Sequence, residues 1–434
     1  MAKSLRSSLN TGLNNGLRQS ISGGVNGLGF FKTASLDLQF ASKKTLNDRV
    51  SSSNLITFTR ASSGTYVDGA GIIQSATTNT PRFDHDPVTG ESLGLLKEEA
   101  STNLLTYSEE FDQSAWQKSN ATVTSNAIAA PDGTTTADLV LDNTVNTSHS
   151  IGHDSPTLSS GIDYTFSVYA KAQDLDHCFL LLYSGGGAFP TTAASYDLTN
   201  KTASSAAGTP AFSIEDAGNG WRRLSITETT TSAATTKAEV RLSQDGNWNN
   251  RNYVGSGQGI YLWGAQLEAG SVPTSYIQTT SSTVTRAADI LSITGTNFSS
   301  FYNQSAGTLF VEYQAYSASG NQQIAGFTQG TNNSIRWGAW NNQLFMTNSG
   351  TQYFASLSPS ASPTKVAFAA TGNDAIGALN GTLTAQDTSV TMPAVDNLHI
   401  GSTAAYLDAF SGHIKRLAYF ATRQPEATLE GITT

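Results

Sequence analysis

The amino-acid sequence predicts an all-β protein of tandem antiparallel β-sandwich (jelly-roll) domains with an extended N-terminal arm. Charged residues make up only 13% of the 434 residues, and serine, threonine, asparagine and glycine take their place. Such a composition favours strands and turns, because helical surfaces are normally built from glutamate, lysine and arginine. Short segments alternate apolar and polar residues, as half-buried strands do, and turn-forming residues separate them. The length suits two or three domains.

Residues 1–33 form a separate region. Leucine or isoleucine recurs every four residues from Leu5 to Ile21, which is close to helical spacing, but the intervening asparagines and glycines are poor helix formers. The few apolar side chains cannot bury themselves within so short a segment. We therefore expect an attachment arm that orders against a partner, with a disordered tail as the alternative.

Residues 34–105 are expected to form a small β-rich connecting segment. LDLQF from Leu36 and NLITFTR from Asn54 both alternate apolar and polar residues, as strands do. SSGTYVDGAGIIQSA indicates two strands joined at Asp68-Gly69, since Asp-Gly is a hairpin-turn dipeptide.

Residues 106–285 contain several short strand patterns separated by turns, which is typical of a sandwich or jelly roll. The expected strands are TVTSN near 122, Tyr164–Ala172, His177–Ser184, Gly220–Thr229, Lys237–Ser243 and Gly259–Gly270. Trp116, Trp221 and Trp263 stand in or beside alternating strand patterns, which predicts that they pack in a core.

Residues 286–434 form the last predicted sandwich. AGTLFVEYQAY from Ala306 alternates cleanly, and Asn380-Gly381 in AIGALNGTLTA is a hairpin signal. Near the C-terminus, Pro425 and Glu426 begin a short segment rich in glutamate and leucine. Proline and an acidic residue at this position are typical of a helix start.

Two groups of residues carry a resemblance to known families. The run PRFDHDPVTGESLGLLKEEASTNLLTYSEEFDQSAW (Pro81–Trp116) resembles a segment of tailed-bacteriophage virion structural proteins, where it precedes a carbohydrate-binding-module-like β-sandwich. YTFSVYAKA, GNGWRRLSIT and IYLWGAQLEAGSVPTSYIQ follow in the order found in those modules. The resemblance implies a module of this kind over 106–285.

Four C-terminal segments resemble the end of concanavalin A-like (laminin G-like) domains. These segments are Ile400-Gly401, the expected turn Phe410–Ile414, the expected strand Lys415–Phe420 and the expected helix Pro425–Glu430. The resemblance implies a concanavalin A-like sandwich over 286–434.

Composition excludes several classes of function. The net charge is −9, whereas a nucleic-acid partner requires a basic face. No run of 18 apolar residues predicts a membrane span, and the N-terminus lacks the apolar core of a signal peptide. Synthesis in a host cytoplasm is therefore expected. The single cysteine, Cys178, precedes FLLLY and is expected to be a buried thiol.

No enzyme is predicted. Glycosidases require two carboxylates at a defined separation, and the Glu-x-Asp-x-x-Glu strand of concanavalin A-like enzymes is missing. There is no Gly-x-Ser-x-Gly elbow and no phosphate-binding Gly-Lys-Ser/Thr loop. No catalytic residue and no cofactor are therefore expected.

Two patterns raise the question of a metal. His149 and His153 have the spacing of a helical zinc site, but serine, glycine and proline around them oppose a helix, so a solvated loop is expected. Asp84, Asp86 and Glu91 alternate as in a calcium loop, yet Pro87 breaks the pattern and favours a turn. Sandwich modules of the resembled type can hold a structural calcium ion, for which the sequence identifies no ligands.

The best candidate binding residues lie in the polar loop Ser243–Gly257. Sugar binding needs an aromatic face flanked by hydrogen-bonding groups, and an aromatic residue in so polar a loop indicates a contact. That contact can be a glycan, a neighbouring subunit or local packing. The candidates are Trp248, Tyr253, Asn249, Asn250 and Arg251, with Trp337 and Trp340 as a second set in which at least one ring is expected in the core.

We therefore expect a non-enzymatic phage virion protein on the particle surface, in a tail fibre, baseplate or receptor-binding position, that recognises host-surface polysaccharide. A capsid decoration or head-fibre protein is the first alternative, and a polysaccharide depolymerase the second. The expected partners are other virion proteins, bound through the arm, and further copies of the chain. A homotrimer is expected by analogy with fibres.

Overall fold

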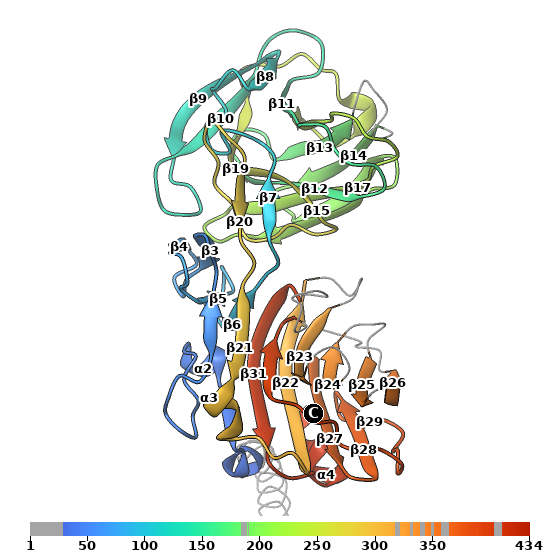
Figure 1. Cartoon of the computed structure of the whole chain (residues 1–434). Helices are drawn as coiled ribbons and strands as arrows, with labels where there is room; N and C mark the ends of the chain where they lie inside the picture. Colours follow the sequence, from blue (N-terminus) through green and yellow to red (C-terminus); the bar gives the residue numbers. More distant parts are fainter. Residues whose placement is uncertain are drawn as a thin grey trace, which may run out of the picture. The chain divides into compact units, whose positions relative to one another are not determined.

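A computed structural model of the chain describes residues 29–183, 189, 191–316, 322–329, 333–338, 343–348, 351–356, 364–402 and 410–434. Their regular secondary structure consists almost wholly of antiparallel strands, so the predicted all-β sandwich class is confirmed (Figure 1). They divide into two compact units, 59–289 and a second unit that joins 29–58 to 290–434. The connector predicted at 34–105 therefore contributes residues to both units.

The unit 59–289 contains a β-sandwich of two sheets. One sheet has the order β16 (Ala211–Asp216), β17 (Arg222–Thr229), β12 (Asp163–Ala172), β19 (Gly259–Ala269), β10 (Ala137–Asp142) and β9 (Ala121–Ile128). The other has the order β15 (Thr202–Ala207), β14 (Thr192–Asp197), β13 (His177–Tyr183), β18 (Lys237–Ser243), β11 (Ser150–Asp154) and β8 (Trp116–Ser119).

The core of this sandwich follows from the alternation of side chains along each strand. In β13 the residues Cys178, Leu180 and Leu182 point into the space between the sheets, whereas Phe179 and Leu181 belong to a separate apolar cluster on the outer face. Cys178 is fully buried, as expected, and burial raises the pKa of its thiol to about 12. The thiolate, which is the reactive form, is therefore strongly disfavoured.

The outer face of the other sheet carries a second aromatic cluster. Tyr169 and Trp263 project from β12 and β19, and Trp221 and Tyr276 pack beside them. The tryptophans at 116, 221 and 263 are all buried, which confirms the prediction that they are core residues.

Short strands precede the sandwich in the chain. They are the hairpin β3 (Gly64–Val67) and β4 (Ile73–Ala76), the pair β5 (Arg82–His85) and β6 (Ser92–Lys97), and β7 (Ser101–Asn103), which pairs with β20 (Val284–Arg286). The predicted hairpin around Asp68 is confirmed. The carboxylate of Asp68 accepts hydrogen bonds from the backbone of Ala70 (2.9 Å) and Ile72 (3.1 Å), which closes the turn.

A buried ion cluster joins the beginning and the end of this unit. Arg82 lies between Glu98 (2.7 Å) and Asp289 (2.5 Å), while Arg60 contacts Asp289 at 3.0 Å and Arg286 contacts Glu98 at 3.2 Å. Buried charges are tolerated only when paired and hydrogen-bonded. The cluster therefore requires that the residues before the sandwich and those after it remain together.

The unit of 29–58 and 290–434 is a second sandwich. One sheet contains β29 (Thr382–Leu383), β28 (Asp374–Leu379), β27 (Thr364–Thr371), β22 (Ala306–Ala315), β31 (Gly412–Phe420) and β1 (Leu36–Leu38), in that order of pairing. The other contains β21 (Ile290–Thr294), β30 (Asn397–Ile400), β23 (Gln323–Gln329), β24 (Asn333–Gly338), β25 (Gln343–Asn348) and β26 (Thr351–Ser356). Tyr419 of β31 packs against Phe327 of β23 at 5.2 Å between ring centroids, so aromatic rings fill the space between the sheets.

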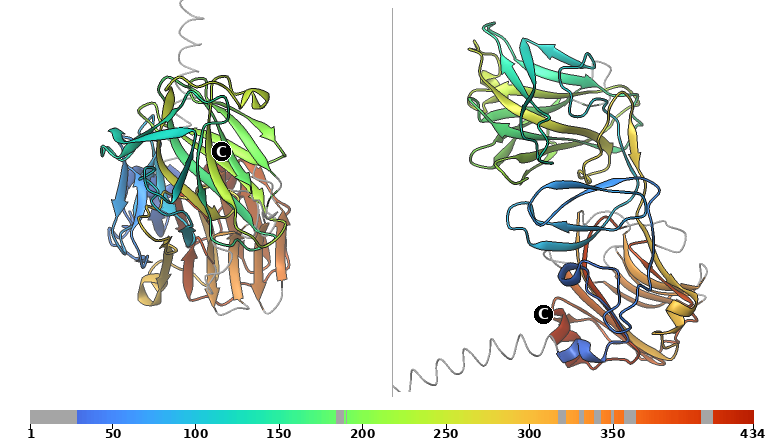
Figure 2. Two further views of the ribbon diagram at one scale, coloured as in Figure 1. Left: turned by 90° about the horizontal axis from the view of Figure 1, so that it is seen from above. Right: turned by 90° about the vertical axis from the view of Figure 1, so that its left-hand side faces the viewer.

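The first described residues belong to this unit. Strand β1 pairs with β31, and η1 (Phe31–Thr33) and α2 (Phe40–Lys43) also contact that strand; the segment is blue and β31 is red in Figures 1 and 2. Phe31 and helix α4 (Glu426–Thr433) share one apolar cluster on the sheet. The predicted helix start at Pro425 and Glu426 is confirmed. Short elements complete the list: β2 (Thr57–Thr59), η2 (Trp248–Asn250) and α3 (Gly295–Ser299).

Candidate functional site

The predicted binding loop between β18 and β19 is held in one shape by its own polar residues. Asn247 precedes η2, and its side chain accepts a hydrogen bond from the backbone of Asn249 at 3.0 Å. The amide of Asn250 donates to Asp245 at 2.6 Å. Asparagine and aspartate favour such turns because their side chains imitate backbone acceptors. The loop therefore presents Trp248 from a braced turn.

The indole of Trp248 lies on the outer face of the sheet that contains β13. It meets the buried ring of Phe179 edge to face, with centroids 5.2 Å apart. The guanidinium of Arg251 lies 4.8 Å from the indole centroid and that of Arg241 lies 5.4 Å from it. Both distances are typical of cation–π contacts. The indole itself is only half-buried, so part of its surface is open to a ligand.

The charge of Arg241 is compensated by the carboxylate of Glu239. Glu239 accepts hydrogen bonds from Arg241 at 3.0 and 2.7 Å and from the hydroxyl of Tyr183 at 3.0 Å. Burial, together with the carboxylate of Glu239, raises the pKa of Tyr183 to about 12. Arg251 donates to the carbonyl of Trp248 at 2.9 Å and has no acidic partner within the described residues. One guanidinium charge therefore remains uncompensated at this surface.

We call this surface the Trp248 face. It consists of Phe179, Tyr183, Glu239, Arg241, Trp248 and Arg251. It combines a partly accessible indole with the guanidinium of Arg251, which has no acidic partner in the described part of the chain; the indole can stack on a sugar ring and the guanidinium can hydrogen-bond to its substituents.

The other predicted residues differ in their positions. Asn249 is exposed beside Trp248, whereas Tyr253 is only 8% exposed and packs on His149 with ring centroids 4.6 Å apart. Tyr253 is buried because its backbone bridges to Thr147 and closes the loop onto the sandwich. Trp337 belongs to strand β24, and Trp340 lies outside the described residues.

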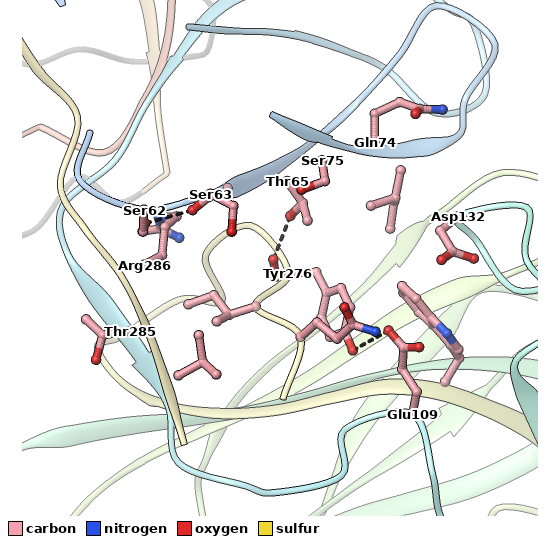
Figure 3. Close-up of a pocket in the computed structure, with 16 residues that line it drawn as sticks. Ser62, Ser63, Thr65, Gln74, Ser75, Glu109, Asp132, Tyr276, Thr285 and Arg286 are labelled. Carbon is pink, nitrogen blue, oxygen red and sulfur yellow. Dashed lines mark hydrogen bonds between the residues drawn. The ribbon is translucent and has the colours of Figure 1, made fainter. Parts of the chain in front are cut away.

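A cleft of about 360 Å³ lies on the side of the sandwich that carries Trp263 (Figure 3). Its volume is at the lower end of the range of small-molecule sites, which is about 300–1,000 Å³. We call it the acidic cleft. Its lining consists of Ser62, Ser63, Gly64, Thr65, Ile73, Gln74, Ser75, Glu109, Asp132, Trp263, Tyr276, Ile277, Gln278, Val284, Thr285 and Arg286.

One wall of the acidic cleft is the hairpin β3–β4. Thr65 and Ser75 face each other across this hairpin, so their side chains lie on the same side of it. The hydroxyl of Thr65 donates to the carbonyl of Tyr276 at 2.6 Å, which fixes that side toward the segment after β19. Figure 3 shows both side chains at the cleft.

Two carboxylates line the acidic cleft. Glu109 accepts a hydrogen bond from the hydroxyl of Tyr276 at 2.9 Å, and burial, with a contribution from Asp132, raises the pKa of Glu109. Asp132 uses one carboxylate oxygen to accept from the backbone and hydroxyl of Thr134, at 2.9 and 2.7 Å. Its other oxygen has no hydrogen-bond partner among the described residues.

Sequence reasoning missed the acidic cleft. Its lining comes from four separated stretches, 62–75, 109, 132 and 263–286, and no single stretch contains a recognisable motif. The available signal was indirect. The segment from Gly264 through Tyr276, which resembles the end of the phage modules, continues beyond strand β19 with mostly polar residues. In the structure this continuation and Trp263 line the same cleft.

The patterns that raised a metal site do not gather ligands. Among the described residues, no group of three or more histidine, cysteine, aspartate or glutamate side chains could hold a metal ion. His153 lies in β11, where its ring contacts the hydroxyl of Thr106 at 2.9 Å. Asp86 accepts the backbone hydrogen bonds of a turn from Val88 (2.9 Å) and Thr89 (2.8 Å). None of the described helices has the length and apolar character needed to cross a membrane.

Comparison with known proteins gives distant structural likenesses. No protein-family model matches the chain, and no curated protein matches it. The CBM40 of a Ruminococcus gnavus IT-sialidase is 17% identical, with a TM-score of 0.27, over 30% of this chain and 84% of that one. Domain 4 of AbnA, a GH43 arabinanase from Geobacillus stearothermophilus solved with arabinotriose, is 13% identical, with a TM-score of 0.30, over 38% and 84%.

Mouse laminin alpha1 domains LG4-5 are 9% identical, with a TM-score of 0.23, over 71% of this chain and 92% of that one. Structural neighbours of the chain thus include carbohydrate-binding modules and laminin LG domains, and no bacteriophage protein is among these three. The likenesses are too distant to carry a functional argument.

Proposed function

We propose that this chain is a non-enzymatic structural protein of a bacteriophage particle that binds host-surface glycans through the Trp248 face. The observation that carries the glycan proposal is the half-buried indole of Trp248, which packs on Phe179 and has two guanidinium groups within 5.4 Å of its centroid. An indole fixed in this way can stack on the C–H face of a sugar without losing conformational freedom on binding. The phage role rests on the resemblance of the segment Pro81–Trp116 to tailed-bacteriophage virion structural proteins.

The charges of the face favour a particular class of glycan. Glu239 is neutralised by Arg241, whereas Arg251 has no acidic partner among the described residues. A glycan with a carboxylate can accept hydrogen bonds from this guanidinium, and charge-assisted hydrogen bonds are about twice as strong as neutral ones. The Trp248 face is therefore proposed to prefer acidic polysaccharides.

The first prediction concerns Trp248→Ala. Loss of the stacking surface should lower the affinity for host polysaccharide at least about tenfold, in the range seen when aromatic anchors are truncated at binding sites. Arg251→Gln should weaken binding of acidic glycans more than that of neutral ones. Both are measured by glycan array and isothermal titration calorimetry with the full chain. Asn200→Ala, on the exposed turn after β14, is the matched surface control.

Trp248→Ala also distinguishes the three possible roles of this loop, which are glycan binding, contact between copies of the chain and local packing. A changed mass in light scattering, with unchanged glycan binding, would instead assign Trp248 to a contact between copies of the chain. A fall in melting temperature with neither effect would leave the indole a packing residue and would refute the proposal.

Antibody labelling of particles addresses the position in the virion. We propose a tail-fibre, baseplate or receptor-binding position, with a homotrimer as the assembly. The part of the predicted arm that precedes Phe31 is proposed to attach the chain to other virion proteins, because Phe31 itself is buried in the unit of 29–58 and 290–434. Electron microscopy with an antibody against 286–434 should place label at the tail. Label over the head would overturn the receptor-binding proposal and would identify a decoration protein.

A further inference from the structure

The acidic cleft and the Trp248 face lie on opposite outer faces of the same sandwich. Trp248 packs with Phe179 on the sheet that contains β13, whereas Trp263 and Tyr276 lie on the outer side of the sheet that contains β12. The two sites share no residue. A ligand in the cleft would therefore bind independently of one at the Trp248 face.

The chemistry of the lining selects for hydrogen-bond donors. Ionised carboxylates only accept hydrogen bonds, and Glu109 and Asp132 both line the cleft. The single cation in the lining, Arg286, is engaged by Glu98 at 3.2 Å and by the carbonyl of Glu99 at 2.5 Å. An anionic ligand would consequently meet two carboxylates with no free positive charge to offset them.

The remaining lining is hydroxylated and amide-bearing. Ser62, Ser63, Ser75, Thr285 and Gln278 each supply groups that both donate and accept hydrogen bonds. These groups match a ligand with many hydroxyls around a compact ring. The aromatic floor is rigid, because Trp263 and Tyr276 pack with centroids 4.5 Å apart and both rings are buried.

We infer that the acidic cleft is a second saccharide site, specific for a neutral sugar unit whose hydroxyls donate to Glu109 and Asp132. Its preference is thus opposite to that of the Trp248 face, where an unpaired guanidinium favours acidic sugars. The cleft was not among the sites expected from the sequence, and its assignment stands on its volume, its hydroxylated walls and the placement of its carboxylates.

The test uses the full chain in the Trp248→Ala background, so that binding at the other face does not contribute. Saturation-transfer NMR is recorded with the methyl glycosides of glucose, galactose, mannose and N-acetylglucosamine, and with glucuronic acid. At least one neutral glycoside should receive saturation, and glucuronic acid should receive none.

Two further variants locate the binding. Ser75→Trp, at an exposed strand position, should fill the cleft and abolish the signal. Glu109→Gln keeps the shape and can still accept from Tyr276, and it should weaken binding about tenfold or more, because hydrogen bonds to charged groups are the stronger ones. Melting temperatures and circular dichroism of both variants establish that they fold.

The inference fails if no neutral glycoside binds in the Trp248→Ala background, if binding survives both variants, or if glucuronic acid binds as well as the neutral sugars. Loss of neutral-sugar binding in Trp248→Ala alone would assign that binding to the Trp248 face. Conversely, neutral-sugar binding that persists in Trp248→Ala and disappears in Ser75→Trp supports the cleft even if the proposed function of the Trp248 face is wrong.

Discussion

Single residues with buried charge set the stability of the unit formed by 29–58 and 290–434. Asp37 lies in the middle of β1 with no exposed surface, and its carboxylate accepts two hydrogen bonds from Arg416, both at 2.8 Å. Arg49 also pairs with it. Arg416 in turn lies over the ring of Phe31, 3.4 Å from its centroid. One carboxylate thus connects the first described strand to the C-terminal strand β31.

The variant Asp37→Asn should lower the free energy of unfolding of this unit by about 2 to 3 kcal/mol. The shape is kept, but two arginines lose their counter-charge, and breaking a buried ion pair costs about 3 to 5 kcal/mol when both partners are buried. The lower figure applies because the side chains of Arg49 and Arg416 remain 39% and 18% exposed and water screens them. Urea unfolding of the full chain measures the loss.

Glu430→Gln, an exposed carboxylate of the same unit, is the control and should change the free energy of unfolding by less than about 0.5 kcal/mol. A double-mutant cycle with Arg416→Gln gives the coupling directly. Additive losses in that cycle would mean that the ion pair does not stabilise the fold, contrary to the argument.

The residue scale also explains which parts of the binding site sequence reasoning could find. Trp248 was identifiable because a large aromatic residue stood in a polar loop, and the structure leaves part of its ring accessible. Tyr253 stood in the same loop, yet the bridge between Thr147 and Tyr253 turns it inward. Glu109 and Asp132 gave no local signal, because only the folded chain brings their segments to one cleft.

At the scale of elements, the local sequence pattern was sufficient to predict a strand and its bounds where the strand contains apolar residues that alternate regularly. The prediction for β18 matches its bounds, Lys237–Ser243, and those for β12 and β19 differ by a residue at one end. β14 and β15 were missed. They consist mainly of small and hydroxylated residues, and they are strands because β13 offers a partner edge, which no local pattern contains.

One element was partly wrong. LDLQF predicted a strand through Phe40, but β1 ends at Leu38 and helix α2 begins at Phe40. The ring of Phe40 is fully buried, and Lys44 adopts a left-handed conformation that ends the short helix. Tertiary burial of Phe40 therefore determines the turn, and alternation alone could not show it.

The hairpin β28–β29 permits a prediction at this scale. Asn380 and Gly381 have φ angles of +44° and +80°, and Leu379 pairs with Thr382 across them. Positive φ at both central residues is the requirement of a type I′ turn. Gly381→Ala should therefore lower the free energy of unfolding by about 1 to 2 kcal/mol, because a Cβ is strained in the left-handed region.

A contact adds to this cost, since a Cβ at Gly381 would lie 2.9 Å from the hydroxyl oxygen of Thr434. Gly372→Ala is the matched control in the turn before β28, where φ is not in the left-handed region and no heavy atom lies within 4 Å of the added Cβ. Equal melting temperatures for the two variants would refute the assignment of strain to the Asn380-Gly381 turn.

At the scale of the whole molecule, two buried carboxyls of the unit 59–289 give stability opposite dependences on pH. Burial raises the pKa of Glu98, but the charges of Arg286 and Arg82 outweigh it and lower that pKa to about 2. Because this lies below the ordinary value of 4.5, the stabilisation from Glu98 is complete above about pH 4.5 and is lost as the pH falls toward 2. Acid therefore weakens the ion cluster.

Asp138 has the opposite sign. Burial raises its pKa to about 6, although the backbone amides of Asn126 and Phe111 donate to it and lower the value. Its folded pKa exceeds the ordinary value of 3.8, so its contribution is complete below about pH 4 and is lost as the pH rises through 6. The loss amounts to about 3 kcal/mol at about 1.4 kcal/mol per pKa unit.

The stability of the wild type relative to Asp138→Asn should therefore fall by about 2 kcal/mol between pH 4 and pH 7, because only the wild type carries this titration and a part of the loss has already occurred at pH 4. Urea unfolding at half-unit pH steps measures it. Subtracting the profile of the variant from that of the wild type removes the contribution of other groups that titrate in this window. One of them is His153: burial lowers its pKa, so its contribution to stability is lost as the pH falls.

Asp174→Asn, which replaces an exposed carboxyl, is the control and should leave the pH profile of stability unchanged. A difference that does not vary with pH would show that Asp138 is already ionised near pH 4, and that the hydrogen bonds from Asn126 and Phe111 outweigh its burial.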